Sequence, residues 1–124
     1  MEAISKEILE ERRKRFLEIE TDYENLGYQY WLSLTQEAAT KERFENRQVE
    51  GLASGEVKGS NAEQRQGSAQ QVYSREWKAY LYARGEVLKL KPDFQLLEAR
   101  FQIQKALLRT EEALIRISTG ESEE

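Results

Sequence analysis

The strongest constraint on the fold is a stretch of about 45 residues, from Ala3 to about Val49, with no proline and one glycine, Gly27. Apolar residues recur along it in steps that alternate between three and four, the spacing of a coiled-coil seam, and steps of four at the end indicate that the stripe shifts. These positions are Phe16, Ile19, Tyr23, Leu26, Tyr30, Leu34 and Ala38. The pattern predicts one long amphipathic helix, which we bound at residues 3–50.

A turn is predicted at residues 51–60, because the segment contains three glycines and has no apolar period. Ser60 is the expected cap of the following helix. Glu63, three residues on, is expected to reach back to the Ser60 amide in a capping box.

The second helical arm is expected at residues 61–118, with Pro92 as the one proline of the chain. Its predicted stripe is Ala69, Tyr73, Tyr80, Ala83, Val87, Leu90, Phe94, Leu97, Phe101 and Leu108. A proline inside a helix removes one hydrogen bond and crowds the preceding turn. The chain is therefore expected either to kink at Pro92 or to end a helix near Leu90 and restart.

Together the two arms predict an all-α fold, a long antiparallel helical hairpin with a kink or break at Pro92. A turn centred near residues 55–56 places Phe16 opposite Phe94 and Gln95, Tyr23 opposite Leu88, and Gly27 opposite Arg84 and Gly85. The second arm also carries a spare apolar row beside its stripe. Only 39% of the residues are hydrophobic and 34% are charged, so two helices alone have a thin core. Self-association into a bundle is expected to complete it.

We expect a single helical domain at residues 1–118, followed by an acidic disordered tail at 119–124. The first residues lack the apolar core of a leader peptide, and no run of about 18 apolar residues exists to span a membrane. The expected location is cytoplasmic, which means the host cytoplasm if a phage encodes the chain.

Several kinds of active site are excluded by composition. The chain has no cysteine and no histidine, so zinc sites of the usual kind and histidine- or cysteine-based catalysis are absent. No glutamate is expected on the apolar stripes, which argues against a carboxylate-bridged metal pair. No glycine-rich phosphate loop is present. We therefore expect no enzyme, no metal and no cofactor.

Aromatic residues gather in the middle of both arms, and the predicted register joins them in one belt. Most are expected to fill the seam. Tyr28 and Tyr82 lie off the stripes and are expected to be exposed. With neighbouring cations they could form a surface for single-stranded nucleic acid or a protein partner. The candidate binding residues are Tyr28, Arg75, Lys78, Tyr82, Arg84 and Lys89.

An acidic segment of the first arm suggests a different role. The net charge is −4, and Glu18, Glu20, Asp22 and Glu24 could imitate a nucleic-acid backbone. This is the alternative candidate face.

The pattern as a whole resembles small helical-hairpin proteins of bacteriophages. The residues that carry the resemblance are a tyrosine-rich first helix, the Gly-Ser-Asn-Ala-Glu-Gln-Arg segment at 59–65, and Leu-, Ala- and Arg-rich turns at 97–115. Such proteins often lie near recombination genes, and most have no assigned function.

The resemblance implies a non-enzymatic accessory protein that serves DNA recombination or replication. It would form a homo-oligomer and act through a protein partner in nucleic-acid metabolism or through single-stranded nucleic acid. One alternative is an acidic inhibitor of a host nucleic-acid enzyme, such as an anti-CRISPR protein. Another is a structural coiled-coil subunit of a larger assembly.

Overall fold

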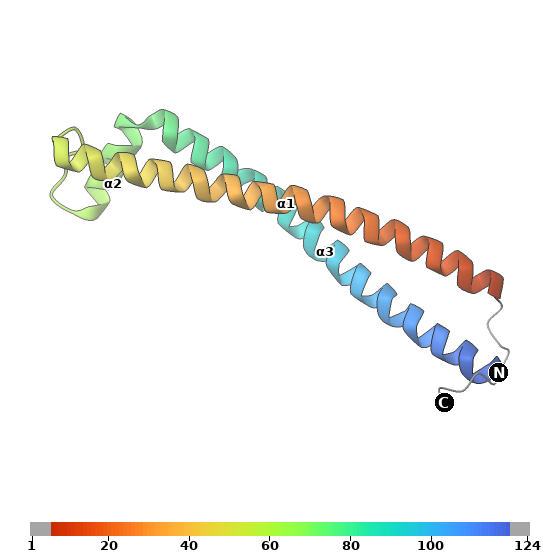
Figure 1. The fold of residues 1–124 in the computed structure, drawn as a ribbon. Helices are drawn as coiled ribbons and strands as arrows, with labels where there is room; N and C mark the ends of the chain where they lie inside the picture. Colours follow the sequence, from red (N-terminus) through yellow and green to blue (C-terminus); the bar gives the residue numbers. More distant parts are fainter. Residues whose placement is uncertain (1–5, 120–124) are drawn as a thin grey trace. The chain divides into compact units, whose positions relative to one another are not determined.

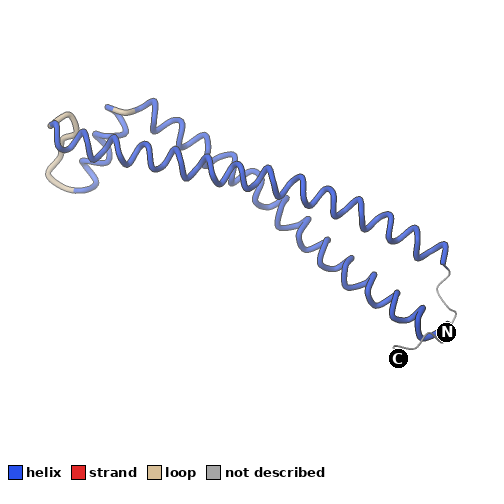
Figure 2. The backbone as a smooth tube through the Cα atoms, in the orientation of Figure 1, coloured by secondary structure: helices blue, strands red, loops and turns tan. Residues whose placement is uncertain are grey.

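A computed structural model of the chain describes residues 6–119. These residues form three helices: α1 (Lys6–Ser54), α2 (Ala62–Val72) and α3 (Ser74–Thr119). Figure 2 shows helix along nearly the whole described chain, and no strand occurs between residues 6 and 119. The predicted all-α class is therefore confirmed. The acidic tail predicted at 119–124 lies almost wholly outside the described residues.

Helix α1 ends at Ser54 rather than near residue 50, so the predicted turn begins too early. Gly55 adopts φ +83°, the left-handed conformation that ends many helices and that glycine adopts without steric cost. The Val57 amide then donates a hydrogen bond to the Gly51 carbonyl at 3.0 Å. Gly51 therefore belongs to the last turn of the helix and not to the loop.

Asn61, and not Ser60, caps helix α2. Its side-chain oxygen accepts a hydrogen bond from the Gln64 amide at 2.8 Å. The Gln64 side chain reaches back and accepts from the Ser60 amide at 2.9 Å and from the Ser60 hydroxyl at 2.7 Å. Asparagine caps at least as well as serine. The capping pair is thus displaced by one residue from the predicted Ser60 and Glu63.

The second arm is interrupted at Tyr73, which the sequence pattern did not indicate. Tyr73 has φ −109° and ψ 47°, and its amide donates to the Ala69 carbonyl as the C-cap of α2. From Ser74 helix α3 continues without interruption through Pro92. The alternative in which a helix ends near Leu90 and restarts is therefore wrong. A kink at Pro92 stays a prediction.

The three helices contribute to two compact units. Unit 1 pairs α1 up to Tyr28 with α3 from Pro92 onward, and unit 2 runs from Gln29 to Lys91. Each unit is described by itself, and a single domain at residues 1–118 stays a prediction.

In unit 1 the two helices pack antiparallel through a ladder of aromatic rings. The Phe16 ring lies 5.4 Å from that of Phe101, and the Tyr23 ring lies 5.5 Å from Phe94 and 4.8 Å from Phe101. The predicted partners, Phe94 or Gln95 for Phe16 and Leu88 for Tyr23, are wrong by about two helical turns. The physical reason is the later end of α1, because each residue added before the turn shifts every facing pair.

The predicted meeting of two glycines is wrong for the same reason. A Cβ atom on Gly27 would lie 3.3 Å from the Phe94 ring, whereas one on Gly85 would meet nothing within 4 Å. Gly27 thus makes room for an aromatic ring, and Gly85 has no packing role.

A glutamate lies in the seam of unit 1, against the prediction that none would. Glu111 is 8% exposed and forms an ion pair with Arg12, while the neighbouring Glu112 accepts a hydrogen bond from Arg13 Nε at 3.2 Å. The second Glu111 oxygen, Oε2, has no hydrogen-bond partner within the described residues. Burial of a charged carboxylate is unfavourable unless a counter-charge pairs with it. The ion pair with Arg12 therefore offsets the cost of burying the Glu111 carboxylate.

In unit 2 a small core lies where α2 packs beside the end of α1 (Figure 1). Phe44, Val57 and Ala69 are buried, and Tyr73 and Trp77 cover them. The centroid of the Phe44 ring lies 5.0 Å from that of the Trp77 ring. The break at Tyr73 turns α2 away from the line of α3, so that Ala69 reaches this core.

The seam of α1 keeps its alternating steps beyond Tyr30. The inward positions are Ser33, Glu37, Thr40 and Phe44, whereas Leu34 and Ala38 are exposed. The predicted shift of the stripe is therefore wrong. Thr40 is 3% exposed, and its hydroxyl is satisfied by the carbonyls of Gln36 and Glu37 at 2.8 and 3.0 Å. By contrast, every predicted stripe position of the second arm is at least half-buried.

Candidate binding surface

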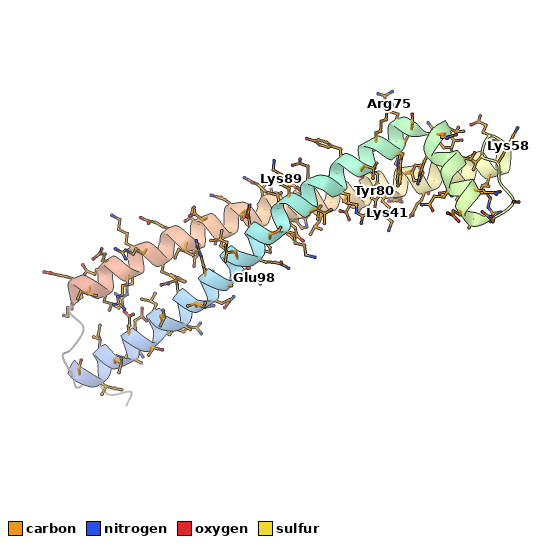
Figure 3. The ribbon with its side chains drawn as sticks, turned by 180° about the vertical axis from the view of Figure 1, so that it is seen from behind. Lys41, Lys58, Arg75, Tyr80, Lys89 and Glu98 are labelled. Carbon is orange, nitrogen blue, oxygen red and sulfur yellow. The ribbon has the colours of Figure 1, made fainter. Side chains whose placement is uncertain are left out.

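Four of the six predicted binding residues share one side of α3 within unit 2. Arg75, Lys78, Tyr82 and Lys89 follow one another in steps of three, four and seven, which place them on one face of a helix with 3.6 residues per turn. All four are exposed. We call them the Tyr82 face. Figure 3 labels Arg75 and Lys89, whose side chains extend outward from α3.

Tyr82 is the aromatic residue of this face, and 72% of it is exposed. A ring that open is available for contact rather than used for packing, as the sequence predicted. Tyrosine offers both a flat apolar surface and a hydroxyl, which suits it to stacking on a nucleic-acid base or on a partner side chain.

Arg84 lies on the other side of α3. It is two residues after Tyr82, and two residues correspond to about 200° of rotation around a helix. Arg84 lines a separate hollow of about 200 Å³ together with Lys41 and Tyr80, both labelled in Figure 3. The structure therefore does not bring Arg84 together with the Tyr82 face.

A hollow of about 530 Å³ adjoins the Tyr82 face. Tyr82, Ala79 and Ala83 of α3 line it on one side and Leu32 of α1 on the other, with Glu86 as an acidic member. Leu32 is 43% exposed. The size is that of a pocket able to hold a small ring system, and the small alanines leave the Tyr82 ring accessible along its edge.

A second hollow of about 260 Å³ brings Arg43 of α1 beside Arg75. Glu76 also lines this hollow, and its carboxylate oxygen Oε1 lies 3.7 Å from Arg47 Nε. Sequence reasoning missed Leu32 and Arg43. An unshifted seam after Tyr30 would have placed both on the α1 edge that borders this part of α3.

Tyr28 is 63% exposed, as predicted, but it belongs to unit 1. It is the last residue of that unit on α1. Tyr28 is therefore described apart from the Tyr82 face.

The four residues of the acidic alternative do not form one face. Glu18 and Asp22 are four residues apart and border a shallow hollow with Lys14 and Leu17. Glu20 follows Glu18 by two residues, and Glu24 follows Asp22 by two. Two residues correspond to about 200° around a helix, so Glu20 and Glu24 lie on a different side of α1. The acidic segment thus presents two pairs of carboxylates.

The predicted aromatic belt is divided between the units, and most of its members pack inside. In unit 1 the Tyr23 ring stacks on Phe101. In unit 2 the ring centroids of Trp77 and Tyr80 lie 5.6 Å apart. Tyr73 has a different role, because its hydroxyl donates a hydrogen bond to the Glu56 carboxylate at 2.8 Å. The core interpretation of these rings is confirmed for Tyr23, Trp77 and Tyr80.

The hydrogen bond from Tyr73 makes its ionisation dependent on Glu56. The donated hydrogen bond, assisted by partial burial, raises the pKa of the Tyr73 phenol above its ordinary value of 10.0. Because the pKa is raised in the folded state, the Tyr73–Glu56 hydrogen bond stabilises the fold fully below pH 10. This stabilisation disappears as the pH rises through the raised pKa of the folded state. We expect Tyr73→Phe to be less stable than wild type at pH 8, and the difference to shrink above pH 10.

Urea unfolding of both proteins from pH 8 to pH 11 measures this difference. Spectrophotometric titration at alkaline pH should also show that the variant lacks a late-titrating phenol. Tyr82→Phe is the matched control, since Tyr82 is exposed. A constant difference in stability across the range would contradict the assigned hydrogen bond.

Between residues 6 and 119 no group of three or more acidic residues is placed to hold a metal ion. None of the helices in this range has an apolar stretch long enough to span a bilayer. No protein-family model, curated protein or solved structure matches the chain.

Proposed function

We propose that the protein is a non-enzymatic accessory protein of phage type that serves DNA recombination or replication and contacts single-stranded nucleic acid through the Tyr82 face. The observation that carries the proposal is the common side of Arg75, Lys78, Tyr82 and Lys89 on α3. Single-strand binding without base readout needs cations along a backbone track and an exposed ring on which bases stack. The Tyr82 face provides both.

The hollow beside Tyr82 supports the same interpretation. A base stacked on the Tyr82 ring could rest its edge against Leu32 and the small side chains of Ala79 and Ala83. Arg43, next to Arg75, adds a fourth cation at one end of the track. The acidic-mimic alternative has weaker support, because its carboxylates fall into two pairs on different sides of α1.

Fluorescence anisotropy with a labelled single-stranded oligonucleotide tests the proposal. Binding through the three cations of the Tyr82 face, without Arg43, should weaken about twentyfold between 50 and 200 mM salt, given a slope of about 0.7 per phosphate contact. Tyr82→Ala should weaken binding by about tenfold, since stacking on one base contributes roughly 1–3 kcal/mol. Lys78→Glu should weaken it further by reversing a charge in the centre of the track.

Arg84→Glu is the matched control, because it makes the same change of charge on the same helix but on the other side. We expect Arg84→Glu to retain nearly all the binding that Lys78→Glu loses. Equal losses in the two variants would show that binding follows net charge and not the Tyr82 face. The absence of binding at about 100 μM protein in low salt would reject direct contact with nucleic acid, since nonspecific binding is detectable in that range.

A further inference from the structure

A second apolar stripe follows α3 in unit 1, on the side away from the Phe16–Phe101 ladder. Leu96, Ile103, Leu107, Leu114 and Ile117 occupy it, separated by steps of seven, four, seven and three. This is the same period as the packed seam, so the five side chains lie along one line of the helix. Leu96, Ile103, Leu107 and Ile117 are 49–76% exposed.

Small residues fill the spaces beside this stripe. Ala99, Ala106 and Ala113 are also exposed, and they recur every seven residues next to the large side chains. Alternating large and small residues allow two helices to approach closely, with the large side chains of one seated over the alanines of the other. We call the stripe and these alanines, together with Arg100 and Thr110, the outer face of α3.

Charge argues against a nucleic acid as the occupant of the outer face. Arg100 is its one charged residue between Leu96 and Ile117. A nucleic acid requires several cations, and a strongly charged protein partner requires opposing charges. An apolar face with a single charge instead fits an apolar helix with the same spacing, and the outer face itself is such a helix.

The length of the outer face suits an interface between two copies. A permanent homodimer buries about 2,000 Å² or more in total, or about 1,000 Å² per copy. The outer face extends from Leu96 to Ile117, about 30 Å along α3, and is lined by large aliphatic side chains that are exposed along its whole length. Two such faces in contact provide an interface on that scale.

The interior gives the same indication. The buried hydrophobic residues described are six, and two of them are alanines. By contrast, the outer face alone presents four large aliphatic side chains that are about half-exposed or more. The burial of these side chains would remove apolar surface from water, which favours association of a chain with so small a core.

From these observations we infer that the outer face of α3 binds the same face of a second copy of this chain, so that the α1–α3 pairs of two unit 1 regions form a four-helix arrangement. This surface lies in a different unit from the Tyr82 face, and the inference does not depend on the proposed function. Light scattering coupled to size exclusion is the first test. Wild type should have twice the mass of the chain, or a higher multiple, at micromolar concentration.

The double variant Ile103→Glu/Leu107→Glu should reduce the mass to that of one chain, because it introduces four charges into each dimer interface. Both side chains are about half-exposed, so helix content by circular dichroism should remain. The matched control is Leu88→Glu, at a residue that is 59% exposed on α3 but lies in unit 2. It should retain the wild-type mass.

Wild-type protein with the mass of one chain would overturn the inference and leave another protein as the occupant. A double variant that keeps the wild-type mass would overturn it as well. If the double variant unfolds, single cysteines decide the question, since the chain has none of its own. A short bismaleimide should join Leu107→Cys into a covalent dimer much faster than Leu88→Cys. Equal rates for the two would reject the assigned face.

Discussion

Phe44→Ala is expected to destabilise the protein by about 3–5 kcal/mol, a large part of the 5–15 kcal/mol that folded domains usually have. Phe44 is 4% exposed and lies at the centre of the core that α2 completes. Its ring contacts Trp77 at a centroid distance of 5.0 Å. Removal of the ring leaves a cavity that neighbouring alanine and valine side chains cannot fill.

Urea denaturation followed by circular dichroism measures the loss for Phe44→Ala. Trp77 emission should shift to longer wavelength, because the ring that covers it is gone. Leu88→Ala is the control and should change stability by less than about 0.5 kcal/mol, since Leu88 is 59% exposed. Similar losses in the two variants would show that the core at the α2 end does not hold unit 2 together.

Gly51→Ala should destabilise the protein by about 2–3 kcal/mol, although alanine favours helix over glycine. A Cβ atom at this position would lie 2.5 Å from the Tyr73 hydroxyl oxygen and 2.6 Å from Val57 Cγ2. Neither neighbour can retreat easily, because Val57 is 4% exposed and the Tyr73 hydroxyl is held by Glu56. The added methyl group therefore has to separate the end of α1 from the junction of α2 and α3.

Gly67→Ala and Gly85→Ala are the matched controls for this substitution. A Cβ atom at either position meets nothing within 4 Å, and both residues lie inside helices. Each should stabilise the protein by about 0.5–1 kcal/mol through the loss of unfolded-state freedom. Thermal unfolding of the three variants gives the comparison. A gain for Gly51→Ala equal to the gain for Gly85→Ala would refute the close packing of Tyr73 against α1.

The sequence determined the features that depend on local periodicity. An α-helix has 3.6 residues per turn, so the spacing of residues decides which of them share a side of the helix, whatever that side packs against. The apolar stripe of α3 and the exposure of Tyr28 and Tyr82 could therefore be predicted. Arg75, Lys78, Arg84 and Lys89 were all chosen because they are close in sequence. The angle around the helix groups three of them with Tyr82 and should have excluded Arg84.

Only the tertiary structure decided the register of the helices and what lies opposite each position. The turn begins about four residues later than its glycines suggested, because Gly51 fits beneath Tyr73 inside the last turn of α1. That change moved the facing pairs and brought Gly27 against Phe94. The break at Tyr73 and the burial of Glu111 opposite Arg12 depend on contacts between residues distant in sequence. Local periodicity contains no information about such contacts, since it fixes which side of a helix packs but not which residue of another helix it meets.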